Sequence, residues 1–502
     1  MAQLSTITRG ETCTLYLRVI GACATSPVYA KELLGNKCIQ SIVSVLRRGT
    51  SGVLHDGLKA LAILCESGEG RGAAIEEGAV DVVLQSMAHL QQLGYGSEAA
   101  QWTAKFLVQL QQEDAAKKDV ALAVEHVPSL LRGGTPVALR YTLCLVEELL
   151  ANEKTAGCVD ASTVSSLVAL LPLLKGKRGA ESSSQSDSST VEAVLLLAEA
   201  GGDGFEVLKD IQTRLLSSFL HLASQESSSE TAVSAGCLPG LVDGLLGELD
   251  PTLQQYCMAA MLRLASSPAL LESVVPAVRP AVQRIVGMLS SENGNVAEHA
   301  MMLLAMLSSD EQTKKVIRQC NGVQYIVQLM HSHQDLHLQQ SLIIAGRLCE
   351  GEEANSIDLL NAGGLMPVVQ LINHDNTSVQ IEAVRALASM ASGGDKIAAA
   401  ILAVGGIRTL VRLLQSPLEE MRENAVRALM YLSQSSVSKA SIVSEGGVTA
   451  IVCVLSSDSL VTQELALRAL QTLCADGRVR EEAVKADVLT RLVGLLSSPG
   501  EK

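Results

Sequence analysis

Aromatic residues are scarce in this chain of 502 residues. They make up 2% of the sequence, with a single tryptophan, whereas hydrophobic residues as a whole make up 48%. Leucine, valine, isoleucine and alanine must therefore supply nearly all of the buried surface. This composition is typical of a protein in which helices pack against helices.

An excess of basic residues is also missing. Asp and Glu outnumber Lys and Arg by 53 to 39, and the net charge is −14. This balance argues against nonspecific nucleic-acid binding and against docking on acidic membranes. No apolar run approaches the ~18 residues of a membrane span. The first residues, MAQLSTITRG, lack the pattern of a signal sequence, and Ala2 excludes N-myristoylation. We expect a cytoplasmic protein, with the nucleus or the cytoskeleton as the other locations.

Sequence motifs of metal-binding cysteines and of catalysis are absent. The twelve cysteines form no CxxC pair, and most of them occupy apolar positions, as Cys144, Cys349 and Cys474 do. We expect buried thiols in a reducing compartment. The sequence contains no GxGxxG, GxxxxGK[ST], HExxH or GxSxG motif. It therefore predicts no enzyme activity, no cofactor and no small-molecule substrate.

One cluster has the residue types of a metal site. His331, His333 and His337 lie in the segment HSHQDLH, with Asp335 between them. Alternating histidines can ligate zinc or copper. The segment also lies where a turn between two helices is expected, and polar residues collect in such turns. We favour a solvated turn and predict no metal.

What the chain has instead is a repeat. The stretch from Gly363 to Gly447 contains two copies of one unit, AGGLMPVVQLINHDNTSVQIEAVRALASMAS and VGGIRTLVRLLQSPLEEMRENAVRALMYLSQ. The second glycines of successive copies, Gly364, Gly406 and Gly447, lie 42 and 41 residues apart. A period of roughly 40–47 residues made only of helices indicates a helical solenoid.

One unit shows why the copies must stack. Residues 398–404 are predicted as a first helix, which Gly405 ends because glycine adopts the left-handed conformation without penalty. Residues 407–414 are a second helix with one apolar face. Ser416 and Pro417 end it, and Pro417 begins the third helix. The inner face of the third helix carries Met421, Ala425, Ala428, Leu429 and Leu432. A single unit cannot bury this face, whereas stacked neighbours can.

The repeat extends over the whole chain. Its register is set by the first residue of the second-helix motif in each copy. These anchors are Ile42, Val83, Val127, Leu167, Leu241, Ile285, Ile326, Val368, Leu410, Ile451 and Leu492. Nine of the ten intervals are 40 to 44 residues, and one is 74 residues. We expect about 10–12 repeats, with the uncertainty in their number confined to the interval from Leu167 to Leu241.

The domain boundaries follow from this register. We predict N-terminal capping helices in 1–34, repeats in 35–174, a flexible Ser-rich insertion in 175–189, a degenerate repeat in 190–235, further repeats in 236–486 and a truncated cap in 487–502. In the insertion, Ser184 has Asp187 three residues later, a spacing that acidophilic kinases favour.

The glycine pair, the LVRLL-type second helix and the VRAL third helix together resemble the armadillo repeat. The resemblance implies an all-α, right-handed superhelix of three-helix repeats. It also implies that the third helices line a concave groove, which grips extended segments of partner proteins.

A ladder of side chains is predicted along that groove. Arg385, Arg427 and Arg468 each follow their anchor by seventeen residues, inside a V/L-Arg-Ala-Leu context. The same Ala-Leu context gives Lys59 and Lys105 near the N-terminus, and the middle repeats place Met302 and Ile343 at this position. With Tyr431, one turn after Arg427, the residues predicted to bind a partner are Lys59, Lys105, Met302, Ile343, Arg385, Arg427, Tyr431 and Arg468. This ladder would be basic at both ends and apolar in the middle. Alternatively, the i,i+4 pairs Glu423–Arg427 and Glu464–Arg468 only support their helices.

The sequence thus predicts a scaffold that binds an extended, acidic segment of another protein. Nuclear import adaptors, which are also armadillo proteins, carry tryptophan in the ladder and asparagine one turn later. Here the later positions hold Ser389, Tyr431 and Thr472, so binding of basic nuclear signals is not expected. Two other functions stay open: regulation of nucleotide exchange on a small GTPase or Hsp70, and a structural role in a cytoskeletal or ciliary assembly.

Overall fold

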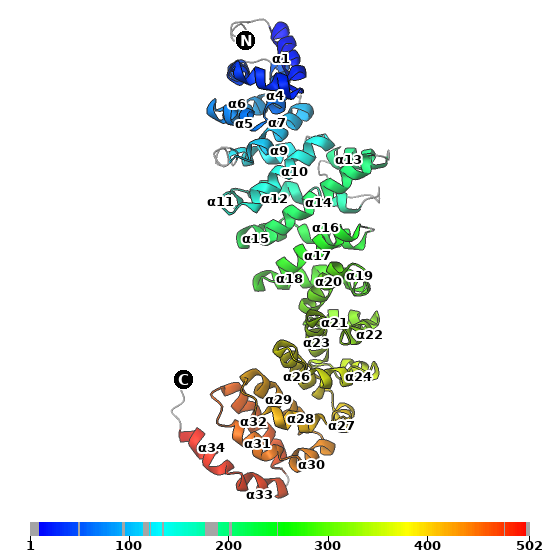
Figure 1. The fold of residues 1–502 in the computed structure, drawn as a ribbon. Helices are drawn as coiled ribbons and strands as arrows, with labels where there is room; N and C mark the ends of the chain where they lie inside the picture. Colours follow the sequence, from blue (N-terminus) through cyan, green and yellow to red (C-terminus); the bar gives the residue numbers. More distant parts are fainter. Residues whose placement is uncertain are drawn as a thin grey trace. The chain divides into compact units, whose positions relative to one another are not determined.

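The computed structural model describes residues 10–48, 51–92, 96–113, 120, 122–132, 135–175, 189–199, 203–247, 249–475 and 477–497. Within these ranges the chain forms helices joined by short turns, and no strand occurs. The chain divides into two compact units, Met1–Val278 and Arg279–Lys502 (Figure 1). We call them unit 1 and unit 2.

Unit 1 begins with a third-type helix and continues as first, second and third helices in turn. Its elements are α1 (Gly10–Ala24), α2 (Pro27–Gly35), α3 (Cys38–Leu46), α4 (Ser51–Leu64), α5 (Gly68–Glu76), α6 (Ala79–Gln92), α7 (Gly96–Leu110), η1 (Leu122–His126), α9 (Val127–Arg132), α10 (Pro136–Ala151), α11 (Glu153–Ala156), α12 (Ala161–Val168), η2 (Leu171–Lys175), α13 (Ser189–Glu199), α14 (Asp203–Ala223), α15 (Glu226–Ser234), α16 (Cys237–Leu246), α17 (Pro251–Ala265) and α18 (Pro268–Val278).

Unit 2 contains the most regular repeats. Its elements are η3 (Arg279–Ala281), α19 (Val282–Met288), α20 (Gly294–Leu307), α21 (Glu311–Gln319), α22 (Gly322–Leu329), α23 (Asp335–Cys349), α24 (Glu353–Asn361), α25 (Leu365–Leu371), α26 (Thr377–Ala391), α27 (Asp395–Ala403), α28 (Gly406–Leu413), α29 (Glu419–Leu432), α30 (Ser436–Ser444), α31 (Gly447–Val454), α32 (Leu460–Leu473), α33 (Gly477–Lys485) and α34 (Val488–Ser497).

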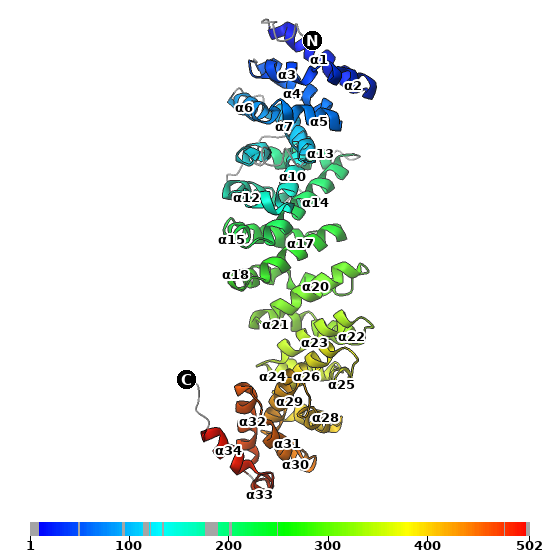
Figure 2. The same cartoon turned by 60° about the vertical axis from the view of Figure 1, so that its left-hand side comes forward.

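Third helices form the spine of each unit. In unit 1 each packs on the next in the order α1, α4, α7, α10, α14 and α17, and in unit 2 the order is α20, α23, α26, α29 and α32 (Figure 2). Their inner residues are fully buried, as Ala425 and Leu429 of α29 are. Each unit therefore buries its apolar surface between neighbouring repeats. The predicted all-α solenoid is confirmed.

The corner between first and second helices uses its two glycines differently. Gly405 has φ +74°, a left-handed conformation, as predicted. Gly406 already belongs to α28, and a Cβ on it would lie 2.7 Å from Ile401 Cγ2. The first glycine is thus required for its backbone angle and the second for its lack of a side chain.

The third helix of this repeat begins later than predicted. We placed Pro417 in its first turn, whereas α29 starts at Glu419 with Leu418 as its N-cap. Pro417 therefore lies in the turn before the helix. The Ser416 hydroxyl accepts the backbone N–H of Leu418, so a side chain shapes this turn.

In the described residues between Leu167 and Leu241, one helix, α14, belongs to the row of stacked third helices. The interval includes α14, which packs directly on both α10 and α17. Hence α14 is the third helix of the repeat anchored at Leu167, and α13 is an inserted helix before it. This differs from the separate degenerate repeat predicted in 190–235. Residues 176–188 of the Ser-rich insertion, with Ser184, lie outside the described residues.

All twelve cysteines are free, and six of them are buried. Burial raises the pKa of the Cys349 thiol to about 12, which fits the predicted role as a small apolar residue. In the described residues no single helix is long and apolar enough to cross a membrane. The pair α30 and α31, bent by 82°, meets that test by length and composition only.

Candidate functional site: the third-helix groove of unit 2

The ladder residues project from the spine because buried residues flank them. On α29, Val426 and Ala428 are both buried, whereas Arg427 between them is partly exposed. Arg385 on α26 has the same surroundings, with buried Val384 and Ala386 on either side. The period of the helix thus turns Arg385 and Arg427, each the seventeenth residue after its anchor, away from the core.

Four of the predicted residues meet in one groove on unit 2. A cavity of about 670 Å³ is lined by Ile343 of α23, Arg385 of α26, and Arg427 and Tyr431 of α29. These three helices are consecutive third helices that pack on one another. The seventeen-residue spacing from the anchors therefore identified side chains of three repeats that line a single surface. Their role in binding stays a prediction.

A second row of residues lines the same groove, and two of its three members were not predicted as binding residues. Arg347, Ser389 and Tyr431 each follow their anchor by twenty-one residues, one helical turn after the first row. We named only Tyr431 from this row as a binding residue. The equal spacing was a signal that could have identified Arg347. Its Nη1 donates to the carbonyl oxygen of Ala305 in α20, which holds the guanidinium in place.

The groove arginines are already engaged with acidic or amide groups of the chain. Arg385 Nη1 lies 2.7 Å from Glu382 Oε1, and its Nη2 lies 4.0 Å from Glu420 Oε2. Arg427 Nη2 lies 2.5 Å from Glu423 Oε1, and its Nη1 donates to Asn424 Oδ1. The alternative prediction of a Glu423–Arg427 pair is therefore confirmed. The groove is less basic than its arginines alone suggested.

Glu382 is the most buried acid of the groove. Burial raises the pKa of its carboxyl above the ordinary value, although Arg385 and Arg347 act in the opposite direction. The carboxylate thus receives positive charge from two consecutive third helices. A buried carboxylate that held only one of these arginines would be more costly to ionise. Glu382 therefore holds the Arg385 guanidinium directly, whereas Arg347 acts on it through charge alone.

Arg468 and Met302 do not line this groove. Arg468 belongs to α32, where its Nη2 lies 2.6 Å from Glu464 Oε1, so the second predicted i,i+4 pair is also present. The Arg468 side chain is 64% exposed. Met302 is partly exposed on α20. Both residues occupy the expected ladder position of their helices, outside the cavity.

Lys59 and Lys105 form a separate cluster in unit 1. Lys59 of α4 and Lys105 of α7 each place Nζ 5.5 Å from the centre of the Trp102 ring. Lys105 Nζ also lies 2.7 Å from Glu66 Oε1. The one tryptophan of the chain is thus held by two cation–π contacts on the third-helix face.

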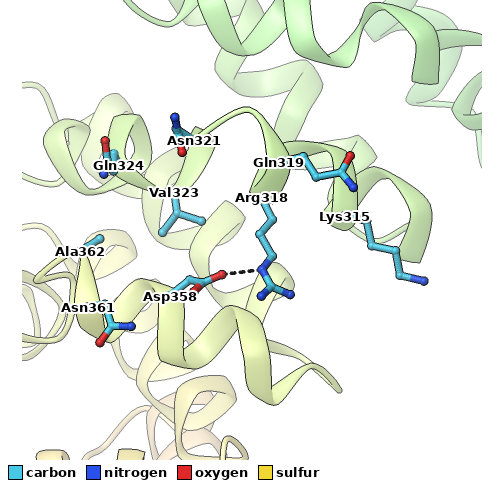
Figure 3. Close-up of a pocket in the computed structure, with 9 residues that line it drawn as sticks. All are labelled: Lys315, Arg318, Gln319, Asn321, Val323, Gln324, Asp358, Asn361 and Ala362. Carbon is cyan, nitrogen blue, oxygen red and sulfur yellow. Dashed lines mark ion pairs between the residues drawn. The ribbon is translucent and has the colours of Figure 1, made fainter.

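Another cavity lies among first and second helices of unit 2 (Figure 3). It has a volume of about 560 Å³ and is lined mostly by exposed polar side chains of α21, α22 and α24. Figure 3 shows the ion pair across it, in which Arg318 Nε lies 2.6 Å from Asp358 Oδ2. Because this pair joins two successive repeats, we interpret the cavity as an inter-repeat seam.

The histidine cluster does not converge. His331 and His333 are exposed in the turn before α23, whereas His337 lies inside α23 and contacts Ser332 Oγ through Nδ1 at 3.1 Å. Across the described ranges, no group of three or more His, Cys, Asp or Glu side chains could hold a metal ion.

Comparison with known proteins agrees with this geometry. Residues 353–392 and 395–434 match the family model described as Armadillo/beta-catenin-like repeat. The chain is an armadillo-repeat protein. The matched residues run from α24 to the turn after α29, so they include much of the groove. A search of curated protein sequences finds no match.

One of three similar solved structures bears on the fold of this chain. The crystal structure of an engineered protein, 24% identical, covers 94% of this chain and 97% of its own, with a TM-score of 0.51. A second engineered protein is 30% identical over 47% of this chain and 96% of its own, with a TM-score of 0.44. A designed armadillo repeat protein is 22% identical over 47% and 99%, with a TM-score of 0.43. Only the first likeness is close enough to bear on the fold.

Proposed function

We propose that this armadillo protein is a scaffold that holds an extended segment of a partner protein in the groove of unit 2. We place this activity in the cytoplasm, as the sequence suggested. The observation that carries the proposal is the meeting of Ile343, Arg385, Arg427 and Tyr431 in one cavity. An open, continuous row of this kind suits a chain segment better than a compact ligand.

Acidic residues of the partner would bind the arginines. Consecutive third helices lie about 10 Å apart, and an extended peptide advances ~3.3 Å per residue. Acidic residues about three positions apart would therefore meet Arg385 and Arg427 in turn. A guanidinium has five N–H donors, so its contact with a glutamate of its own helix leaves donors for a partner carboxylate. Tyr431 and Ile343 would bind apolar residues between them.

The proposal is tested by removing the arginines and measuring peptide binding. The probe is a labelled 12-residue peptide with glutamate at every third position and leucine and serine between. We expect the triple variant Arg385→Ala, Arg427→Ala and Arg468→Ala to lose about tenfold or more in affinity, because charge-assisted contacts contribute ~1–3 kcal/mol when partly desolvated and less when exposed. Fluorescence anisotropy measures the affinity.

A matched control removes three other exposed arginines of unit 2. Arg284, Arg408 and Arg412 lie on second helices and do not line the groove. Their joint replacement by alanine should leave the affinity unchanged. Equal loss in both variants would point to a general charge effect. Unchanged binding with a lowered melting temperature in the first variant would show that the arginines only support their helices.

A further inference from the structure

Two glutamates at one end of the groove have side chains without an ion pair among the described residues. Glu350 is the C-cap of α23, and Glu353 is the first residue of α24; both line the cavity. Neither forms an ion pair with another residue in the part of the chain that the structure describes. Both are exposed. A ligand in the groove can therefore reach both carboxylates.

The polar groups around Glu350 are paired with one another, apart from its carboxylate. The residue lies at the C-terminal end of α23, where the carbonyl groups of Leu348, Cys349 and Glu350 accept hydrogen bonds from other groups of the chain. Lys314 Nζ lies 2.8 Å from the main-chain oxygen of Glu350 and 2.8 Å from Glu311 Oε1. Lys314 therefore binds the helix end and Glu311, and no ion pair joins it to the Glu350 carboxylate.

The opposite end of the groove holds the two arginines and their paired glutamates. The arginines on the α26 and α29 side, Arg385 and Arg427, keep donors in the groove after pairing with glutamates of their own helices. Arg347, between the two ends, is held by the carbonyl of Ala305 and faces Glu382. Unmatched acceptors thus gather at the α23–α24 end, and unmatched donors gather toward α29. A segment with opposite charges at its two ends would therefore bind in the groove in one orientation.

We propose that the groove selects a dipolar segment, with a basic residue on Glu350 and Glu353 and acidic residues on Arg385 and Arg427. This inference rests on the proposed function and refines its partner from an acidic segment to one with opposite charges at its two ends. One to two helix spacings of about 10 Å separate the ends, so the basic residue lies roughly three to six positions from the acidic ones. The basic residue also distinguishes this partner from a uniformly acidic one, which Glu350 and Glu353 repel.

The test compares two labelled peptides on the full chain by fluorescence anisotropy. One is the acidic probe with glutamate at every third position; the other replaces the glutamates of one half by lysine. We expect the dipolar peptide to bind about fivefold more tightly than the acidic one, since two exposed charge contacts replace two repulsions. The preference should shrink as salt is raised, because these charges are exposed.

Charge reversal assigns the preference to its residues. In the variant Glu350→Lys and Glu353→Lys, the order should invert and the acidic peptide should bind more tightly. The control Glu481→Lys and Glu482→Lys makes the same charge change on α33, outside the groove, and should keep the wild-type order. Equal or weaker binding of the dipolar peptide, or an unchanged order in the reversed variant, would overturn the inference while leaving the groove as a binding site. Failure of both peptides to bind the wild type would overturn the proposed function as well.

Discussion

Polar side chains join each repeat to the next at the scale of single residues. Arg71 Nε lies 2.8 Å from Glu113 Oε1, and Arg408 Nε lies 2.9 Å from Glu445 Oε2; in both pairs the partners are about one repeat apart in sequence. Most of these contacts are partly or fully exposed, so water screens them and each contributes little to stability. They set the register between repeats, whereas burial of the third helices supplies most of the stability.

The carboxylate of Glu419 makes several contacts, two of them with the next repeat. Its Oε1 accepts hydrogen bonds from Ser457 and Thr462 of the next repeat, at 2.9 and 2.7 Å, and Arg422 pairs with its other oxygen. Burial alone would raise the pKa of this carboxyl, but the hydrogen bonds from Thr462, Ser457 and Arg422 outweigh burial and hold the pKa below its usual value. Glu419 therefore favours the folded state in its ionised form.

We predict that Glu419→Gln destabilises unit 2 by roughly 1 kcal/mol at neutral pH, the range expected for a lost charged acceptor. Because the folded pKa is depressed, the stabilising effect is complete above the ordinary glutamate pKa of about 4.3 and is lost as the pH falls through the lower folded pKa. Urea unfolding of both proteins across this pH range measures the difference. A destabilisation that stays constant down to pH 3 would show that the charge of Glu419 is not the cause.

At the scale of the element, the corner before each second helix is the feature most sensitive to substitution. In several repeats a residue with a left-handed backbone conformation occupies this corner: Gly405 and Gly446 with φ +74°, and Asn321 with φ +57°. The residue after it is closely packed. A Cβ on Gly322 or Gly447 would lie 2.7 or 2.6 Å from the isoleucine of the preceding helix, as for Gly406. The first position of the corner thus requires a residue that tolerates positive φ, and the second requires a residue without a side chain.

Substitutions at one corner should separate these demands. We predict that Gly405→Ala costs about 1 kcal/mol, because alanine is strained at positive φ. Gly405→Asn should cost less, since Asn321 occupies the equivalent corner before α22. Gly406→Ala should cost the most, because its methyl group meets Ile401. Thermal unfolding of the three variants ranks them. An asparagine variant as unstable as the alanine variant at 405 would contradict the account of the corner.

The sequence predicted the positions of the ladder residues more accurately than the contacts that their side chains make with neighbouring helices. Periodicity alone placed Arg385 and Arg427 on one face, because the helical period and the repeat length can both be read from the sequence. The Glu423–Arg427 pair was equally accessible, as an i,i+4 contact. The contact of Arg385 with Glu420 across two repeats, and the unmatched charges of Glu350 and Glu353, depend on how neighbouring helices pack. The helix start at Glu419 differed from the prediction because a serine hydroxyl, rather than proline, shapes the turn.

At the scale of the whole molecule, each unit is an array in which a repeat packs only on its neighbours. Such an array presents a long row of side chains without needing a single large core. The row need not be uniform: in unit 1 its described ladder residues surround Trp102 with lysines, and in unit 2 arginines face glutamates across the groove. The regular spine thus carries locally different surfaces, which is how one fold can hold different partners.

Site-specific photo-crosslinking tests the proposed groove most directly. A photoreactive phenylalanine analogue would replace Tyr431 or Ile343 in the groove, or Gln324 on α22 as the control, and mass spectrometry would map the crosslinked peptide. We predict that one extended acidic or dipolar segment of a partner crosslinks to both groove positions. Its two crosslinked sites should lie about six residues apart, and Arg385→Ala with Arg427→Ala should abolish both crosslinks. Crosslinks as frequent at Gln324 as in the groove, or unaffected by the arginine changes, would contradict the proposed function.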